Sequence, residues 1–92
     1  MSDRVFKLKS FVNLEGNGQD LEGVMVDTHS ATMCSCNHTA WVLLKAMKSD
    51  VSVPDLADKL VEEFDVGQQD ARRDVLQFIH QLSLMDLIHE TK

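Results

Sequence analysis

The sequence predicts a small α+β domain, and three observations support this class. Two short apolar segments, Val24–Asp27 and Thr32–Cys36, flank a stretch of turn-forming residues, which is typical of a β-hairpin. Three segments in the second half of the chain place apolar residues at the spacing of one helical face. The chain of 92 residues has room for one hydrophobic core, so we expect a single domain over residues 1–92.

The first third of the chain is expected to form an antiparallel sheet. Arg4–Val12 alternates apolar and polar residues imperfectly and is the first expected strand. Asn13–Gly23 contains three of the four glycines and is expected to be a flexible connection. The hairpin of Val24–Asp27 and Thr32–Cys36 then completes a small three-stranded sheet.

The first helix is expected to begin at Asn37, directly after the hairpin. As an N-cap, the Asn37 side chain can accept a hydrogen bond from the backbone N–H of Thr39 or Ala40. Apolar residues then recur at the spacing of one buried face, at Ala40, Leu43, Leu44 and Met47. A strand that passes straight into a capped helix keeps an uncovered outer edge, and we expect the function at this edge.

The second helix is expected to begin with a capping box. Ser52 stands at the N-cap, Asp55 is at the third helical position, and Pro54 lies in the first turn. The apolar stripe of this helix consists of Leu56, Ala57, Leu60, Val61 and Phe64. Asp65–Gly67 ends the helix, and Gly67 is able to adopt the positive φ of a turn.

The third helix is expected from Gln68 to Met85, and a short strand at Leu87 and Ile88 follows it. Its apolar face consists of Ala71, Val75, Phe78, Leu82 and Met85. Two helices joined by a tight turn, preceded by a third helix and flanked by strands, form a winged helix-turn-helix arrangement. We therefore expect a small antiparallel three-stranded sheet followed by three helices.

The composition excludes several classes of protein. Fifteen acidic and nine basic residues give a formal net charge of −6, which repels nucleic-acid phosphates and anionic membranes. No signal peptide is recognised after Met1, and no apolar run approaches the ~20 residues of a membrane span. Cys34 and Cys36 share one face of a strand, where a disulfide is unfavourable, so we expect reduced thiols. The sequence predicts a soluble, cytoplasmic protein that binds neither nucleic acid nor membranes.

An ordered series of short motifs resembles the PqqD-like family. The motifs are Asn37-x-Thr39, Glu63-Phe64-Asp65-Val66 and Asp74-Val75-Leu76, with the apolar tail Leu87-Ile88. The similarity extends from about Gly23 to Glu90, which is most of the chain. The sequence departs from the family pattern at Ala40, where the family usually has glycine, and in the strand Thr32–Cys36, where aromatic residues are common.

The resemblance implies a peptide chaperone, also called a RiPP recognition element, rather than an enzyme. Such a domain binds the leader of a ribosomally synthesised precursor peptide and presents it to a modifying enzyme, such as a radical SAM enzyme. The family takes its name from PQQ biosynthesis and acts in natural-product biosynthesis. The leader is bound as an added strand, in the cleft against the third helix, and no cofactor is implied.

We therefore predict a peptide-binding site between the outer edge of the hairpin and one flank of the third helix. The strand edge is expected to be formed by Thr32, Met33, Cys34 and Ser35. With Val75 at the centre of the core stripe, the helical period places four residues on one flank, Arg72, Leu76, Ile79 and Ser83. The simpler alternatives are a solvated strand edge and ordinary packing of Leu76 at the margin of the core.

Metal binding and catalysis are the weaker interpretations of the same region. Cys34, Cys36 and His38 are suitable zinc ligands, with His29 as a fourth, but their spacing differs from that of structural zinc sites. Ser35 and Cys34 are potential nucleophiles near His38, yet no acid is placed to orient that histidine. We therefore predict neither a metal site nor an enzyme.

DNA binding is the alternative function. The third helix carries polar and basic residues typical of a DNA-reading helix, namely Gln68, Gln69, Arg72, Arg73 and Gln77. Asp70 and Asp74 interrupt this surface, and the net charge opposes contact with phosphates. A structural or oligomer-forming adaptor is a third class that the sequence leaves open.

Overall fold

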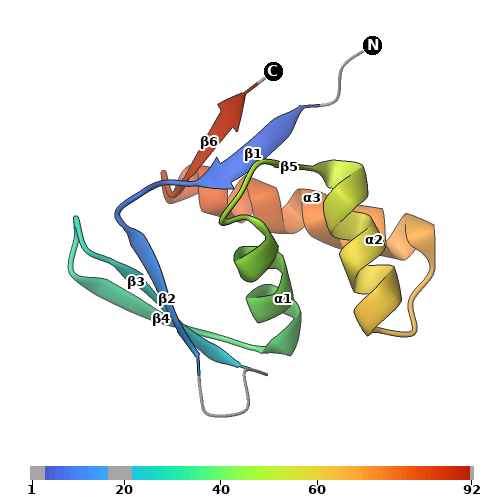
Figure 1. Cartoon of the computed structure of the whole chain (residues 1–92), viewed down its shortest axis with the longest axis horizontal. Helices are drawn as coiled ribbons and strands as arrows, with labels where there is room; N and C mark the ends of the chain where they lie inside the picture. Colours follow the sequence, from blue (N-terminus) through green and yellow to red (C-terminus); the bar gives the residue numbers. More distant parts are fainter. Residues whose placement is uncertain (1–3, 17–21, 92) are drawn as a thin grey trace.

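Three helices and two small antiparallel sheets form the fold (Figure 1), in a computed structural model that describes residues 4–16 and 22–91. The elements are β1 (Val5–Leu8), β2 (Val12–Gly16), β3 (Gly23–Asp27), β4 (Thr32–Cys36), α1 (His38–Ala46), β5 (Val51–Ser52), α2 (Val53–Glu63), α3 (Gln68–Leu84) and β6 (Ile88–Thr91). The predicted α+β class and the order of the three helices are confirmed. Among the described residues, no helix has the length and apolar character needed to span a membrane.

The strands form two sheets where the sequence predicts one. One sheet has the order β5-β1-β6 and the other β2-β3-β4. The predicted strand Arg4–Val12 is interrupted by a turn in which the N–H of Val12 donates to the carbonyl of Lys9 (3.1 Å). The chain before the turn pairs with the C-terminal strand, with Phe6 opposite Glu90, and so confirms the predicted final strand.

The chain after this turn corrects a second prediction. Residues 13–16, expected to be part of a flexible connection, extend β2 and pair with β3, so that Leu14 lies opposite Met25. The remainder of the predicted connection, residues 17–21, lies outside the described residues. Val51 and the predicted N-cap Ser52, for which no strand is expected, pair with β1 as the short strand β5.

The predicted caps of the first two helices are present. The Asn37 side-chain oxygen accepts from the N–H of Ala40 (2.9 Å). Ser52 and Asp55 form a reciprocal capping box, with backbone-to-side-chain distances of 3.2 and 3.3 Å. Gly67 is the N-cap of α3 at φ −77°, so it does not use the positive φ that glycine makes available. The turn is made by extended backbone at Phe64, whose carbonyl accepts from the N–H of Val66 (2.9 Å).

We expect Asn37→Ala to lower the free energy of unfolding by about 1 kcal/mol, because a helix-start N–H loses its partner. The measurement is the urea midpoint of both proteins. Asn13→Ala, an exposed position on β2, is the matched control and should change the midpoint little. Equal midpoints for the two variants would show that the Asn37 cap contributes no stability.

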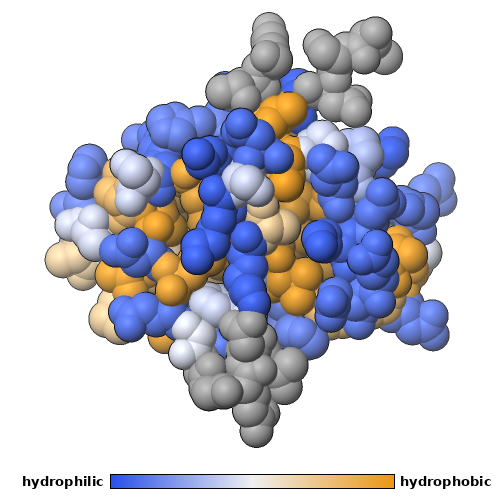
Figure 2. Space-filling model, viewed as in Figure 1, coloured by the Kyte–Doolittle hydropathy of each residue, from blue (hydrophilic) through white to orange (hydrophobic). Residues whose placement is uncertain are grey.

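The buried apolar residues form one cluster between the helices and the two sheets. In Figure 1, α1 lies between the β2-β3-β4 sheet and α2, and α3 crosses behind both helices. The buried face of α3 consists of Ala71, Val75, Ile79 and Leu82. It is rotated from the predicted stripe, because Ile79 takes the core position expected for Phe78 and Met85 is 47% exposed. Outside this core, Figure 2 shows apolar side chains in small patches between polar ones on the displayed face.

Candidate functional site

The outer edge of β4 has no strand partner among residues 4–16 and 22–91, because β4 is the last strand of its sheet. On its inner side β4 pairs with β3, with Ser35 opposite Val24 and Met33 opposite Val26. Met33 and Ser35 point outward and are exposed, whereas Cys34 is half-buried. The predicted edge at Thr32, Met33, Cys34 and Ser35 is therefore a row of backbone groups open to an added strand.

A hollow of about 300 Å³ lies between the start of α1, which follows β4 directly, and one face of α3. The residues after the strand contribute Asn37, Thr39, Ala40 and Leu43, and α3 contributes Asp74, Gln77, Phe78 and Gln81. Phe78 is half-buried and packs against the core, so it forms an apolar floor under a mainly amide rim. We call the surface formed by the β4 edge and this face of α3 the β4–α3 groove.

Two backbone hydrogen bonds fix the loop between β1 and β2. Thr28 N–H, in the hairpin turn, donates to the Phe11 carbonyl (3.1 Å), and Lys9 N–H donates to the carbonyl of Leu87, which follows α3 (2.9 Å). Met33 on β4 (68% exposed) and Leu84 at the end of α3 (74% exposed) are large apolar side chains that the fold leaves exposed.

The structure does not bring the predicted flank of α3 to β4. Arg72 and Leu76 line a different hollow, together with residues of β1 and α2. Ile79 is in the core at 6% exposure, and Ser83, seven positions after Leu76, lies on the same side of the helix as Leu76. The predicted flank therefore lies apart from the hollow at the start of α1, and the helical period identifies two flanks without indicating which one faces that hollow.

Sequence reasoning also missed the groove residues of α3. Asp74, Gln77, Phe78 and Gln81 follow the i, i+3, i+4, i+7 spacing of one helical face. Among them the sequence indicates Gln77 only as a possible DNA-reading group, and it does not indicate Gln81. The available signal was Phe78, a large aromatic residue on an otherwise polar helical face.

The two histidines of this region pack against aromatic rings, and its two cysteines form no disulfide. The His29 ring stacks on Phe11 with 3.9 Å between centroids, and the His38 ring packs edge-on to Phe64 at 4.9 Å. Both cysteines are free, and burial raises the pKa of the Cys36 thiol. Within the described ranges no three His, Cys, Asp or Glu residues are grouped to hold a metal ion.

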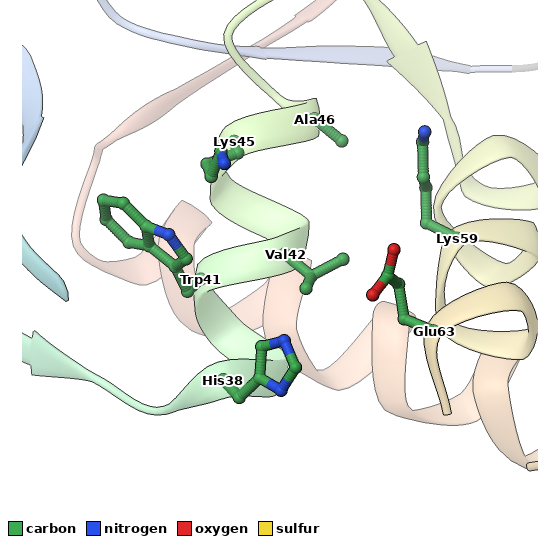
Figure 3. Close-up of a pocket in the computed structure, with 7 residues that line it drawn as sticks. All are labelled: His38, Trp41, Val42, Lys45, Ala46, Lys59 and Glu63. Atoms are coloured by element: carbon green, nitrogen blue, oxygen red, sulfur yellow. The ribbon is translucent and has the colours of Figure 1, made fainter. Parts of the chain in front are cut away.

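A separate hollow of about 390 Å³ lies between α1 and α2, away from the β4 edge (Figure 3). Figure 3 shows Lys59 and Glu63 of α2 facing Val42 and Ala46 of α1. The hollow combines charged side chains of both signs with small apolar ones, and all of its lining residues belong to α1 and α2.

These features define a winged helix-turn-helix domain with an open strand edge beside its third helix. The chain belongs to the family described as coenzyme PQQ synthesis protein D (PqqD), whose model matches residues 22–88. This match confirms the resemblance that the sequence motifs indicate. A search of curated proteins found no match.

Two solved structures share this fold. The first, a lasso peptide synthetase B1 complexed with the leader peptide, is 24% identical with a TM-score of 0.75, over 91% of this chain and 96% of its own. The second, TbiB1 in complex with the TbiA(beta) leader peptide, is 17% identical with a TM-score of 0.79, over 90% of this chain and 94% of its own. At these identities the similarity establishes the fold.

Proposed function

We propose that this protein binds the leader segment of a ribosomally synthesised precursor peptide as an added strand on β4. The observation that supports this most strongly is the open β4 edge beside the amide-rich face of α3. An extended peptide would form main-chain hydrogen bonds to β4, and alternate side chains would point toward α3. Two proteins of the same fold have been solved with leader peptides bound, and the chain belongs to the PqqD family.

The role that follows is that of a peptide chaperone without catalytic activity. It would present the bound precursor to a modifying enzyme, such as a radical SAM enzyme. We place it in the cytoplasm, where Cys34 and Cys36 would remain reduced. The open groove provides positions for peptide side chains, and the nearby histidines pack against aromatic rings rather than beside a nucleophile.

The surface of α3 gives little support to the DNA-binding alternative. Arg73 pairs with Asp70 of the same helix (2.7 Å), and Gln68 donates to Asp58 (2.7 Å). These contacts occupy two of the side chains that would read bases. The net charge of −6 further weakens attraction to phosphates.

The direct test is a titration of the isotope-labelled protein with the leader peptide encoded beside its gene. We expect amide shift changes at residues 32–36, together with changes at the side-chain amides of Gln77 and Gln81. Changes confined to α2, or to residues 68–73 alone, would contradict strand addition at β4.

Two double variants test which flank of α3 contacts the leader. Gln77→Ala with Gln81→Ala removes side-chain hydrogen bonds in the groove and should weaken leader binding roughly tenfold, as expected for about 1.4 kcal/mol. Arg72→Ala with Leu76→Ala is the matched control on the other flank and should leave the leader Kd unchanged. If the Arg72 and Leu76 variant weakened leader binding and the Gln77 and Gln81 variant did not, the leader would contact the flank that the sequence predicts.

A further inference from the structure

A second hollow, of about 330 Å³, lies between β1, the start of α2 and the middle of α3. Its lining consists of Arg4, Phe6, Val53, Pro54, Arg72 and Leu76, and we call it the Arg72 hollow. Leu76 is 51% exposed, and the half-buried Val53 and Pro54 continue this apolar surface over the buried Phe6 ring. An apolar surface that monomer packing leaves open is a candidate for contact with another protein.

The Arg72 hollow and the β4–α3 groove are on opposite flanks of α3. Leu76 and Phe78 are two positions apart, which corresponds to about 200° around a helix. Arg72 and Asp74 have the same relationship, and each pair places one residue in each hollow. A molecule bound in the Arg72 hollow would therefore leave the groove accessible.

Charge distinguishes the Arg72 hollow from an ordinary apolar patch. Its lining includes two arginines and no acidic residue. The Arg4 guanidinium lies 5.7 Å from the centre of the Phe6 ring and pairs with Glu90 through Nη2 and Oε1 at 2.6 Å. Arg72 is exposed and has no hydrogen bond or ion pair with residues 4–16 or 22–91. Its guanidinium is available to a carboxylate from outside.

The surroundings extend this positive charge along β1. A further hollow beside β1 is lined by Lys7, Lys9 and Lys48 together with His89. Five of the nine basic residues, including Arg4 and Arg72, thus line these two hollows, in a chain with a net charge of −6. Lys9 is paired with Asp86 (2.5 Å). With Arg4 also paired, to Glu90, the cations of the two linings without an ion pair to a described residue are Lys7, Lys48 and Arg72. Their charge favours an acidic partner over a basic one.

We propose that the Arg72 hollow is a docking surface for a partner protein that presents an apolar side chain next to a carboxylate. The apolar side chain covers Leu76 and Pro54, and the carboxylate pairs with the guanidinium of Arg72. Because the β4–α3 groove stays open, the partner and a groove ligand bind at the same time. The assignment of this partner as the modifying enzyme rests on the proposed function, whereas the docking surface itself does not.

The test uses the full-length labelled protein, without leader, and two synthetic peptides. The probe is acetyl-Asp-Leu-Glu-Phe-Asp-amide, and the control is acetyl-Lys-Leu-Lys-Phe-Lys-amide, which has the same apolar residues. We expect the acidic peptide to shift the methyl signals of Val53 and Leu76 while the side-chain amides of Gln77 and Gln81 stay unchanged. Arg72→Gln should weaken this binding about threefold, as for an exposed ion pair. Arg73→Gln, which replaces an arginine already paired with Asp70, should not.

Several outcomes would overturn the docking surface. Equal shifts with the lysine peptide would show a contact without charge selection, and no shift with either peptide would show no docking. Movement of the same methyl signals on dilution of the protein alone would identify a second copy of the chain as the occupant. If the protein responds to the acidic peptide but does not bind the leader, the result contradicts the proposed function and still supports this docking surface.

Discussion

Ser35→Pro should reduce leader binding by about tenfold or more while the β3–β4 hairpin stays folded. Proline removes one backbone N–H, and a strand added to β4 requires the N–H groups that point away from β3. Loss of one such hydrogen bond accounts for about 1 kcal/mol, and the proline ring also obstructs the incoming strand. Isothermal titration with the leader measures the affinity, and Ser35→Ala, which keeps the N–H, is the matched control.

The direction of each N–H follows from the pairing of β3 with its two neighbours. Thr28 N–H donates to the Phe11 carbonyl (3.1 Å), on the side of β2. Because N–H groups alternate sides along a strand, Met25, three positions before Thr28, directs its N–H toward β4, where it lies opposite Cys34. Cys34 is therefore in a hydrogen-bonded pair with β3, and its neighbours Met33 and Ser35 direct their N–H groups outward. Cys34→Pro should accordingly break the hairpin. Equal effects of Cys34→Pro and Ser35→Pro on the fold would contradict this assignment.

The parts of the fold that the sequence predicts correctly have local signals. Asn37 caps α1, and the capping box of Ser52 and Asp55 starts α2, because each requires only residues three positions apart. The pairing of β1 with β6 has no such signal, since Phe6 and Glu90 lie at opposite ends of the chain. The sequence therefore indicates a strand at each end and does not indicate that the two strands meet in a second sheet.

In the candidate site too, the sequence predicts the part that has a local signal and does not predict how α3 packs. The strand edge at Thr32–Ser35 could be predicted because a hairpin that leads directly into α1 leaves one edge open. The flank of α3 that faces the start of α1 could not be predicted, because the helical period is symmetric about the buried stripe of the helix. The packing of the helices decides that Gln77 and Gln81 line the hollow at the start of α1, whereas Arg72 lines the hollow beside β1 and α2.

Gly23→Ala should destabilise the protein by about 3 kcal/mol, at the upper end of the cost of overpacking. A Cβ at Gly23 would lie 2.5 Å from the Glu15 carbonyl oxygen and 2.5 Å from Cζ3 of Trp41. Neither atom can move easily, because the carbonyl belongs to β2 and the Trp41 ring is buried at 3% exposure between the sheet and α1. The substitution should therefore separate the β2-β3-β4 sheet from α1.

The measurement for Gly23→Ala is urea unfolding monitored by the fluorescence of Trp41, the single tryptophan. Gly67→Ala is the matched control, because a Cβ there meets nothing within 4 Å and the backbone φ of −77° suits alanine. We expect that control to change stability by less than about 1 kcal/mol. Since the sheet that Gly23 holds against α1 also presents β4, the same variant should lose leader affinity. A Gly23→Ala protein with the urea midpoint of the Gly67→Ala control would show that the sheet and α1 are not in the close contact described.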